Sequence, residues 1–376
     1  MTLSDSFTTL RAHIDEATTA SLTHLLSRVG ASGRSEEFSR AVVTSVSGGK
    51  RFRALMAHVG YAISSDTALE TVSLPHLSAA LELYQASALV HDDIIDKADE
   101  RRGMPTPHRT LADHHASSSW IGSSTDFGRH AAILVGDFLF SAATSAADEQ
   151  ALTLREDCAR AFARRFAHMH AEVALGQYLD VRAESLPLPD EDTDHIAAGE
   201  AMEAAALAVV RRKSARYSVM RPLLIGAILG GLPPQGEAAS RLAELGEATG
   251  IAFQLRDDEL GVFGDPARTG KPAGDDLREG KRTVLLALAW QRCDADGRAL
   301  LGRVLANAQA DADEIAAAAA FIEDCGARAA HEERIDEHAE RARRALEALA
   351  AASPGVSASA LADLASVISL LTDRRA

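Results

Sequence analysis

The 376-residue sequence is poor in the residue types that mark several protein classes. It has three cysteines, Cys158, Cys293 and Cys325, and their wide spacing excludes a zinc-ligand pattern. Their odd number argues against a disulfide scaffold, so we expect a reducing compartment, with the cytoplasm as the default location. The N-terminus has no basic segment followed by an apolar run, so we expect no secretory signal.

Long apolar runs and an excess of basic residues are also lacking. No uninterrupted apolar stretch reaches the ~18 residues of a membrane-spanning helix, so we expect no transmembrane segment. Lysine and arginine together number 39 against 54 acidic residues, which gives a net charge of −15. Because nucleic-acid binding requires basic surface, we expect no nucleic-acid partner.

Good helix formers dominate the chain, whereas runs of β-branched residues are scarce. Between the main breaks, apolar residues recur at three- and four-residue spacing, as at Leu77, Leu81 and Tyr84. We therefore predict an all-α fold. Residues 1–376 are expected to form one domain, a bundle of about ten or more helices, with the N-terminal ~25 residues peripheral.

Short segments rich in Gly, Pro and Ser separate the predicted helices; they lie at 116–128, 183–194, 230–237 and 261–282. Helices are predicted near 8–28, 37–63, 75–97, 129–147, 150–182, 193–212, 214–230, 236–260 and 282–293, with more from 296 to 372.

The stretch “LVHDDIIDKADERRG”, residues 89–103, concentrates charge at the end of one predicted helix. Asp92 and Asp96 lie four residues apart, so their carboxylates share one helix face. Clustered carboxylates at a helix C-terminus repel one another and oppose the helix dipole, so the cluster requires a compensating cation. Mg²⁺ takes oxygen ligands and commonly binds one or two carboxylates plus substrate phosphates. A solvated acidic helix end is the alternative interpretation.

A second charged segment, “FQLRDDELGVFGDPARTGKPAGDDLREGKRT”, spans residues 253–283. Asp257 and Asp258 again end a predicted helix, and Lys271 and Lys281 follow in a loop. Two such acidic helix ends, facing each other across a cavity, would hold several cations. Taken alone, this segment has an alternative interpretation, a polar loop with a helix cap.

Two basic segments accompany the acidic ones. In “GGKRFR”, residues 48–53, the glycines let the backbone approach a ligand, and Lys50 and Arg53 supply charge for phosphate, with Arg51 the weaker candidate. The spacing is not that of a P-loop, and a solvated basic turn is the alternative. In “RRKSARYS”, residues 211–218, Lys213 is either a phosphate contact or part of an exposed helix face.

Together with “AAILVGDFLF”, these segments occur in an order and spacing that resemble the isoprenyl diphosphate synthase (polyprenyl synthetase) family of the trans type, most like a geranylgeranyl diphosphate synthase. The motifs cover about residues 40–290. The resemblance implies that the helices surround a central elongated active-site cavity. It also implies an enzyme that condenses isopentenyl diphosphate with allylic diphosphates head to tail, giving an all-trans polyprenyl diphosphate. It also implies a homodimer and Mg²⁺, about three ions per site, with Mn²⁺ as a substitute.

The resemblance assigns roles at matching positions. The implied metal ligands are Asp92, Asp93, Asp96, Asp257 and Asp258, of which Asp93 and Asp258 are supporting residues. The implied contacts of the allylic diphosphate are Arg101, Lys213, Ser214, Gln254, Lys271 and Lys281. Those of isopentenyl diphosphate are Lys50, Arg53, Gln85 and Arg102. Gly261 stands where the second acidic motif of the family ends in Asp, which puts the role of that last carboxylate in doubt.

The family mechanism begins with loss of the allylic diphosphate, which leaves a carbocation. The double bond of isopentenyl diphosphate attacks C1 of that cation, and a proton is then lost to the departing diphosphate. Metal and cationic side chains stabilise charge as it develops on the leaving group. Water must be excluded, because it would capture the cation.

Product length is expected to depend on the helix that carries Asp92. Ser87 and Ala88, where bulk blocks short products in the family, are small. Tyr84 lies one turn deeper on the same face, and a turn rises about 5.4 Å, close to the length of an isoprene unit. A floor at Tyr84 predicts geranylgeranyl diphosphate (C20). If Tyr84 instead points away from the tunnel, the product would be C25 or longer.

Two further functions are compatible with parts of this pattern. A terpene cyclase of the same fold needs an Asn/Ser/Glu metal motif, which the single asparagine, Asn307, cannot build. A non-catalytic subunit of a partner synthase would be expected to lose metal ligands, yet Asp92, Asp96 and Asp257 are present.

Overall fold

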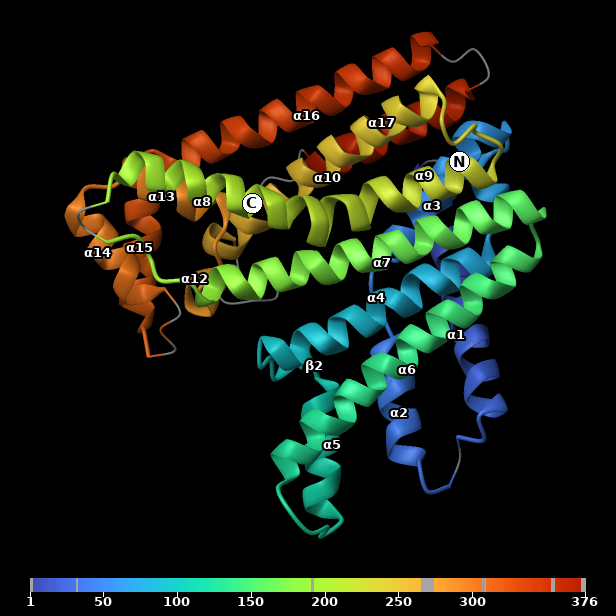
Figure 1. Cartoon of the computed structure of the whole chain (residues 1–376), viewed down its shortest axis with the longest axis horizontal. Coiled ribbons are helices and arrows are strands. Elements are labelled where there is room, and N and C mark those ends of the chain that lie inside the picture. The colour runs from blue at the N-terminus through green and yellow to red at the C-terminus, as the bar shows by residue number, and fades with distance from the viewer. Residues whose placement is uncertain are drawn as a thin grey trace. The chain divides into compact units, whose positions relative to one another are not determined.

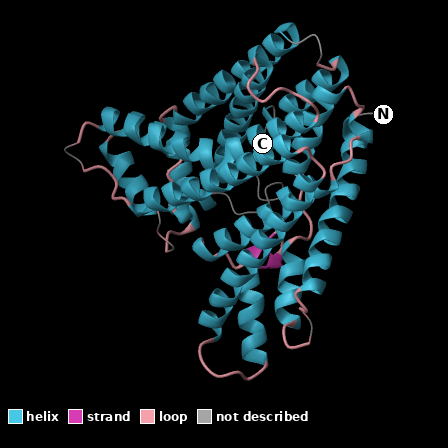
Figure 2. Cartoon of the chain, turned by 45° about the vertical axis from the view of Figure 1, so that its right-hand side comes forward, coloured by secondary structure: helices cyan, strands magenta, loops and turns pink. Residues whose placement is uncertain are grey.

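The computed structural model describes residues 3–31, 33–190, 193–264, 274–305, 307, 309–352 and 356–372. The described chain is almost entirely helical, which confirms the predicted all-α class (Figures 1 and 2). It divides into two compact units, one formed by 1–166 and 225–231 and the other by 167–224 and 232–376. The single domain and the central cavity remain predictions.

The first unit contains α1 (Leu3–Arg28), α2 (Glu36–Ser45), α3 (Phe52–Ser65), η1 (Leu69–Thr71), α4 (Pro75–Ile95), α5 (Pro107–Ser117), α6 (Ser124–Leu152) and parts of α7 (Glu156–Ser185) and α9 (Arg221–Leu229). Helix α4 packs along α6 and also contacts α1 and α3 (Figure 1). After α4, the chain forms a short antiparallel pair of β1 (Glu100–Arg101) and β2 (Met104–Pro105), drawn in magenta in Figure 2.

Helix α4 begins and ends close to the predicted bounds. Pro75 occupies its first turn, where the fixed φ of proline suits a helix. At the other end, the Asp96 N–H donates to the Asp92 carbonyl at 2.8 Å, and Lys97 adopts a left-handed φ of 56°, which stops the helix. The acidic cluster is therefore fixed at the point where α4 turns into β1.

The single helix predicted over 37–63 is wrong, because the structure has two helices, α2 and α3, with the glycine segment between them. Gly48 and Gly49 have φ angles of 70° and 98°, and Arg51, which precedes the first residue of α3, has a φ of 52°. A right-handed helix cannot continue through left-handed backbone. The break places the basic side chains at a helix N-terminus, where anions are favoured.

Helix α6 is the one helix in the described part of the chain that is long and apolar enough to cross a membrane, judged by length and composition. Its most apolar window has a mean hydropathy of 1.3, and 44% of that window is buried in the structure. Asp137 interrupts the window, which is why the sequence shows no continuous apolar run. Because α4 and α5 pack on α6, and a core helix passes the same test, this is weak evidence for a membrane span.

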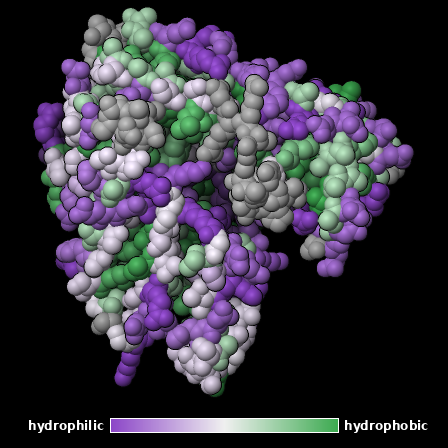
Figure 3. All heavy atoms as spheres, turned by 180° about the vertical axis from the view of Figure 1, so that it is seen from behind, coloured by the Kyte–Doolittle hydropathy of each residue, from purple (hydrophilic) through white to green (hydrophobic). Residues whose placement is uncertain are grey.

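The second unit contains the remaining parts of α7 and α9, and α8 (His195–Val209), the π-helix η2 (Val210–Met220), α10 (Glu237–Phe263), α12 (Asp275–Glu279), α13 (Val284–Arg292), α14 (Ala295–Val304), α15 (Ala312–Asp324), α16 (Ala327–Ala352) and α17 (Ala358–Thr372). Helix α10 packs against η2, α16 and α17, and α13 packs against α8 and α16 (Figure 1). A hydrophobic core joins α10, α13 and α15 and includes Leu255, Leu286 and Ile322. Figure 3 shows one face of the whole chain, where hydrophilic residues cover much of the surface and apolar areas lie between them.

The helix break predicted near residue 213 is wrong, because α8, η2 and α9 follow one another without a gap. The wider turns of a π-helix carry the basic segment, and π-helical turns are frequent at functional sites. Glycines on α7 and α10 allow these helices to pack closely on η2. A Cβ on Gly176 of α7 would lie 2.5 Å from the backbone nitrogen of Lys213, and one on Gly250 of α10 would lie 2.6 Å from Ala215. Such packing is tertiary, and residue spacing does not report it.

Ion pairs join α10 to α16 through Arg256 and Glu259, the residues that flank Asp257 and Asp258 in the sequence. Arg256 donates to Glu332 at 2.7 Å and also contacts Glu259, and Arg328 donates to Glu259 at 2.9 Å. Arg256 and Glu259 are both buried. Removing Glu332 would leave the buried Arg256 without its partner on α16, so that it shares Glu259 with Arg328, which is costly.

We expect Glu332→Ala to lower the free energy of unfolding by about 2–3 kcal/mol, measured by urea denaturation. Glu244→Ala is the matched control, because it removes an α10–α16 pair whose partner Arg341 is exposed, and exposed pairs contribute about 1 kcal/mol or less. Equal losses in the two variants would contradict the importance of the buried network.

Candidate active site

The first acidic cluster meets a cation from the adjoining strand. Arg101 of β1 donates through Nε to the Asp93 carboxylate at 2.6 Å, and its NH2 lies 3.5 Å from Asp92 Oδ2. Asp93 is only 2% exposed, whereas Asp92 and Asp96 are partly exposed. Arg101 thus provides positive charge that the acidic end of α4 requires, and the other two carboxylates remain accessible.

Several arginines gather beside this acidic end. The pKa of Arg102 is lowered, first by partial burial and then by the positive charges of Arg101, Arg51 and Arg53, although Glu82 opposes the shift. Crowded guanidinium groups repel one another, so this region favours a polyanion. The cluster combines side chains from the glycine segment with side chains from β1 and its turn.

Arg102 also reaches the glycine segment itself. Its NH1 donates to the Ser47 carbonyl at 3.4 Å, and a Cβ on Gly49 would lie 2.9 Å from the same nitrogen. The φ of 98° favours glycine at position 49, and a side chain there would also displace the Arg102 guanidinium. The structure brings Arg102 to the segment that carries Lys50 and Arg53. These residues are three of the four predicted isopentenyl diphosphate contacts.

Arg51 directs its donors into the protein. It donates to the Val46 carbonyl at 2.6 Å, contacts Asp15, and lies 3.6 Å from Glu82 on α4. Glu82 in turn accepts from the Ala54 N–H at 3.2 Å, and burial raises its pKa, while the neighbouring arginines oppose this. These bonds hold the left-handed start of α3 and tie the glycine segment to α4.

The predicted chain-length residues lie on α4 in the same unit. Ser87 is buried and Ala88 is partly exposed. The buried ring of Tyr84 packs edge-on against Phe140 of α6, with ring centroids 5.9 Å apart. Burial raises the pKa of Tyr84 to about 12, and the charge of Arg53 opposes this shift. The phenol ring is thus fixed between α4 and α6 on the helix that carries Asp92.

The second acidic motif crowds its carboxylates in the other unit. Asp258, 8% exposed, accepts from Gln254 at 2.8 Å. Burial raises the pKa of Asp258 well above its usual value, and the negative charges of Asp276 and Asp257 add to the shift, whereas Gln254 and Lys281 oppose it. Lys281 donates to Asp276 at 3.3 Å. Of the predicted residues, Gln254 thus contacts Asp258, while Asp258 and Lys281 both lie near Asp276.

Asp276 was not among the predicted site residues, although it lies beside two of them, Asp258 and Lys281. A Cβ placed on Gly261 would lie 2.1 Å from Asp276 Oδ2, so the Asp276 carboxylate occupies the space beside the residue that replaces the last aspartate of the motif. The available signal was the pair Asp275–Asp276 within the quoted second segment. Only the fold shows which of the two turns toward Asp258.

Lys213 also has a partner that was not predicted. It donates to Asp180 of α7 at 2.6 Å, across the close approach that Gly176 permits. Ser214 follows it in η2 and is partly exposed. Gln85 is partly exposed on α4, and Lys271 lies outside the described residues.

The described acidic groups belong to separate units, so sharing of cations between them remains a prediction. Within the described residues, no set of three or more His, Cys, Asp or Glu side chains forms a metal site by itself.

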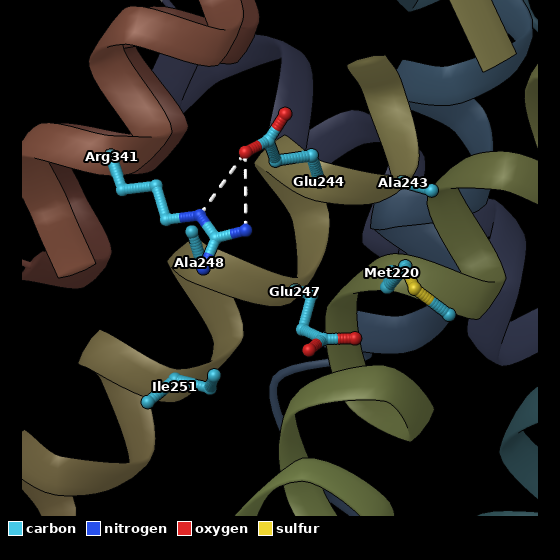
Figure 4. Close-up of a pocket in the computed structure, with 7 residues that line it drawn as sticks. All are labelled: Met220, Ala243, Glu244, Glu247, Ala248, Ile251 and Arg341. Carbon is cyan, nitrogen blue, oxygen red and sulfur yellow. Dashed lines mark hydrogen bonds and ion pairs between the residues drawn. The ribbon is translucent and has the colours of Figure 1, made fainter. Parts of the chain in front are cut away.

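A separate pocket of about 160 Å³ lies in the second unit, between η2, α10 and α16 (Figure 4). Arg341 bonds to Glu244 at 3.1 Å at its edge, and Met220 and Ile251 line its apolar side. None of the predicted site residues lines it, so it is not the predicted substrate cavity.

A sequence model of the family described as polyprenyl synthetase matches residues 35–322. The chain belongs to the polyprenyl synthetase family. This synthase is therefore a prenyltransferase enzyme of isoprenoid biosynthesis, as predicted, and the family is Mg²⁺-dependent.

Relatives of the synthase agree on the reaction class. It is 34% identical over 298 residues to geranylfarnesyl diphosphate synthase from Aeropyrum pernix, covering 79% of this chain and 82% of the relative. It is 30% identical over 278 residues to geranylgeranyl diphosphate synthase from Sulfolobus acidocaldarius, covering 73% of each. A crystal structure of geranylgeranyl pyrophosphate synthase from Corynebacterium glutamicum, complexed with isoprenyl diphosphate and magnesium, is similar at a TM-score of 0.82 and 34% identity, covering 96% of this chain and 99% of that one. The names differ in prenyl chain, so product length is not decided by similarity.

Proposed function

We propose that the synthase condenses isopentenyl diphosphate with allylic diphosphates head to tail and releases all-trans geranylgeranyl diphosphate as its main product. The observation that carries this proposal is the arginine cluster beside the acidic end of α4. There, Arg102 is surrounded by further guanidinium groups, while Asp92 and Asp96 remain partly exposed. Positive charge next to accessible carboxylates suits a metal-bound diphosphate.

The residues present suit Mg²⁺ at both acidic motifs. The donors are carboxylate oxygens, which a hard cation prefers, and the mutual repulsion around Asp258 would be relieved by a divalent ion. We propose Asp92, Asp93 and Asp96 as the first set, and Asp257 with Asp258 as the second, with Asp276 providing the carboxylate that Gly261 lacks. When bound, Mg²⁺ supplies positive charge that stabilises a departing diphosphate. We expect about three ions per site and substitution by Mn²⁺.

The chain's own cations do the remaining work on the substrates. Lys50, Arg53 and Arg102, with Gln85, are proposed to hold isopentenyl diphosphate. The proposed contacts of the allylic diphosphate are Arg101, Lys213, Ser214, Gln254, Lys271 and Lys281. Fixed positive groups favour the leaving diphosphate in the transition state, and its oxygens can then accept the proton lost from the new bond. The apolar face of α4 would exclude water from the cation.

A labelled-substrate assay tests the proposed reaction. With Mg²⁺ present, radiolabel from isopentenyl diphosphate should enter an extractable prenyl product when an allylic primer is added. Chelation of the metal should abolish incorporation. Incorporation that persists unchanged in excess chelator would contradict the proposed role of the two acidic motifs.

Gly49→Ala is expected to raise the KM for isopentenyl diphosphate about tenfold, with a smaller change in kcat. The added methyl group both strains the left-handed backbone and displaces Arg102. Gly30→Ala is the matched control, because Gly30 also has a left-handed φ, 67°, but a Cβ there meets nothing within 4 Å. Similar KM values for both variants would remove Arg102 from the substrate site.

Tyr84→Ala is expected to lengthen the main product beyond C20, because it removes the ring that we place at the floor of the tunnel. Products formed from a C15 primer are to be sized by chromatography. An unchanged C20 product would eliminate Tyr84 as the floor, and wild-type products of C25 or more would show that the ring turns away from the tunnel.

We also propose a homodimer that acts in the cytoplasm. Exposed apolar residues on α6, namely Ile133, Leu134 and Phe140, support a protein contact there, and three free thiols support a reducing location. Light scattering of the purified protein tests the dimer: a monomeric mass at micromolar concentration would contradict it.

A further inference from the structure

Two cysteines that lie 32 residues apart in the chain meet in the second unit. Cys293 caps the C-terminus of α13, and Cys325 caps the C-terminus of α15. Their Sγ atoms are 3.5 Å apart, and both are free thiols. A disulfide requires an S–S distance of about 2.05 Å, so small rotations of the two side chains would bring the sulfurs together.

The two thiols differ in accessibility. Cys293 is 3% exposed and belongs to the core of the unit, and burial raises its pKa. Cys325 is partly exposed and packs against that core from outside, where it also donates to the Ile322 carbonyl at 3.4 Å. An oxidant from solvent therefore meets Cys325 first, and Cys293 is positioned as the resolving thiol behind it.

We propose that Cys293 and Cys325 form a reversible disulfide when the synthase meets a hydroperoxide. The Cys325 thiol gives up its proton, and the thiolate attacks one oxygen of the peroxide. The O–O bond breaks, which gives a sulfenic acid, and the leaving hydroxide takes up the proton as one water molecule. The Cys293 sulfur then attacks the sulfenic sulfur as its proton passes to the sulfenic oxygen, the S–O bond breaks, and a second water leaves. The pair loses two electrons and two protons to the peroxide, and a dithiol reverses the bond by thiol exchange.

The disulfide would close the chain segment that holds α14 and α15, which lie between the two cysteines. A bond that closes a segment of this length restricts the unfolded chain, so we expect the melting temperature to rise by about 5–10 °C. Helix α13 begins directly after Lys281, Arg282 and Thr283, and Cys293 lies at its opposite end, about 13 Å along the helix. We therefore expect prenyl-transfer activity to change by less than about twofold.

The test uses the full-length protein with Cys158→Ser, because Cys158 belongs to the other unit and its replacement prevents competing crosslinks. The protein is treated with a small excess of hydrogen peroxide, alkylated with iodoacetamide, digested and analysed by mass spectrometry. The expected result is a crosslinked peptide pair containing Cys293 and Cys325, absent after dithiothreitol, together with the higher melting temperature. In the additional variant Cys293→Ser, a dimedone adduct should accumulate on Cys325, because the resolving thiol is missing.

Three outcomes would overturn the proposal. They are alkylation of both cysteines after peroxide treatment, conversion of Cys325 to sulfinic acid without a crosslink, and a crosslink that forms only between two molecules. Each is read from the protein itself and does not depend on which prenyl diphosphate the synthase makes.

Discussion

Gly261→Asp, which restores a complete acidic motif, is expected to lower kcat about 100-fold instead of raising it. The space beside Gly261 already holds the Asp276 carboxylate, 2.1 Å from where a Cβ would stand. To make room, Asp276 would have to turn away from Lys281, which donates to it at 3.3 Å, and from Asp258. The new side chain would therefore displace a carboxylate that we propose to be part of the site.

The experiment compares three variants by steady-state kinetics at several Mg²⁺ concentrations. Gly261→Ala introduces the Cβ without the charge, and it is expected to reduce kcat as well. The double variant Gly261→Asp with Asp276→Gly exchanges the two positions, and it should recover at least tenfold over Gly261→Asp alone. A Gly261→Asp enzyme with wild-type kcat and wild-type Mg²⁺ dependence would show that Asp276 has no role at the site.

Asp92→Ala is expected to reduce kcat by about 1,000-fold. The substitution removes a partly exposed carboxylate from the proposed metal set and leaves Arg101 with Asp93 as its acidic partner in α4. Turnover is to be measured with saturating substrates, and circular dichroism verifies that the helices persist.

Asp99→Ala is the matched control for this loss. Asp99 follows α4 closely, its side chain is 71% exposed, and its ion pair with Arg109 spans 3.2 Å at the surface. We expect its kcat to stay within about twofold of wild type, because surface pairs contribute little. If Asp92→Ala retained full turnover, the catalytic role of the first motif would be lost, and a non-catalytic subunit would again be the better interpretation.

Local sequence signals account for the parts of the synthase that depend on one helix. The helical spacing at Leu77, Leu81 and Tyr84 predicted α4, and the charge at its end predicted the acidic cluster. The same signals gave wrong helix bounds where the backbone departs from regular α-helical conformation. The glycine segment separates α2 from α3 because Gly48, Gly49 and Arg51 have positive φ. The π-helical η2 lies where Gly176 of α7 and Gly250 of α10 permit close packing.

The site shows the same division. The first motif and the basic side chain that balances it, Arg101, are close in sequence, so spacing alone was sufficient to suggest their association. Asp180 and Asp276 were missed because each becomes a partner only through packing, one across α7 and η2 and the other beside Gly261. Residue type cannot show which of two adjacent aspartates faces a site. Roles that depend on substrate contact remain proposals.

One product analysis tests the proposed condensation reaction most directly. The purified synthase is incubated with isopentenyl diphosphate and each of the C5, C10 and C15 allylic primers, with and without Mg²⁺, and the products are sized after removal of the diphosphate. We expect Mg²⁺-dependent condensation that converges on a C20 alcohol. No condensation with any primer, or equal condensation without a divalent cation, would contradict it.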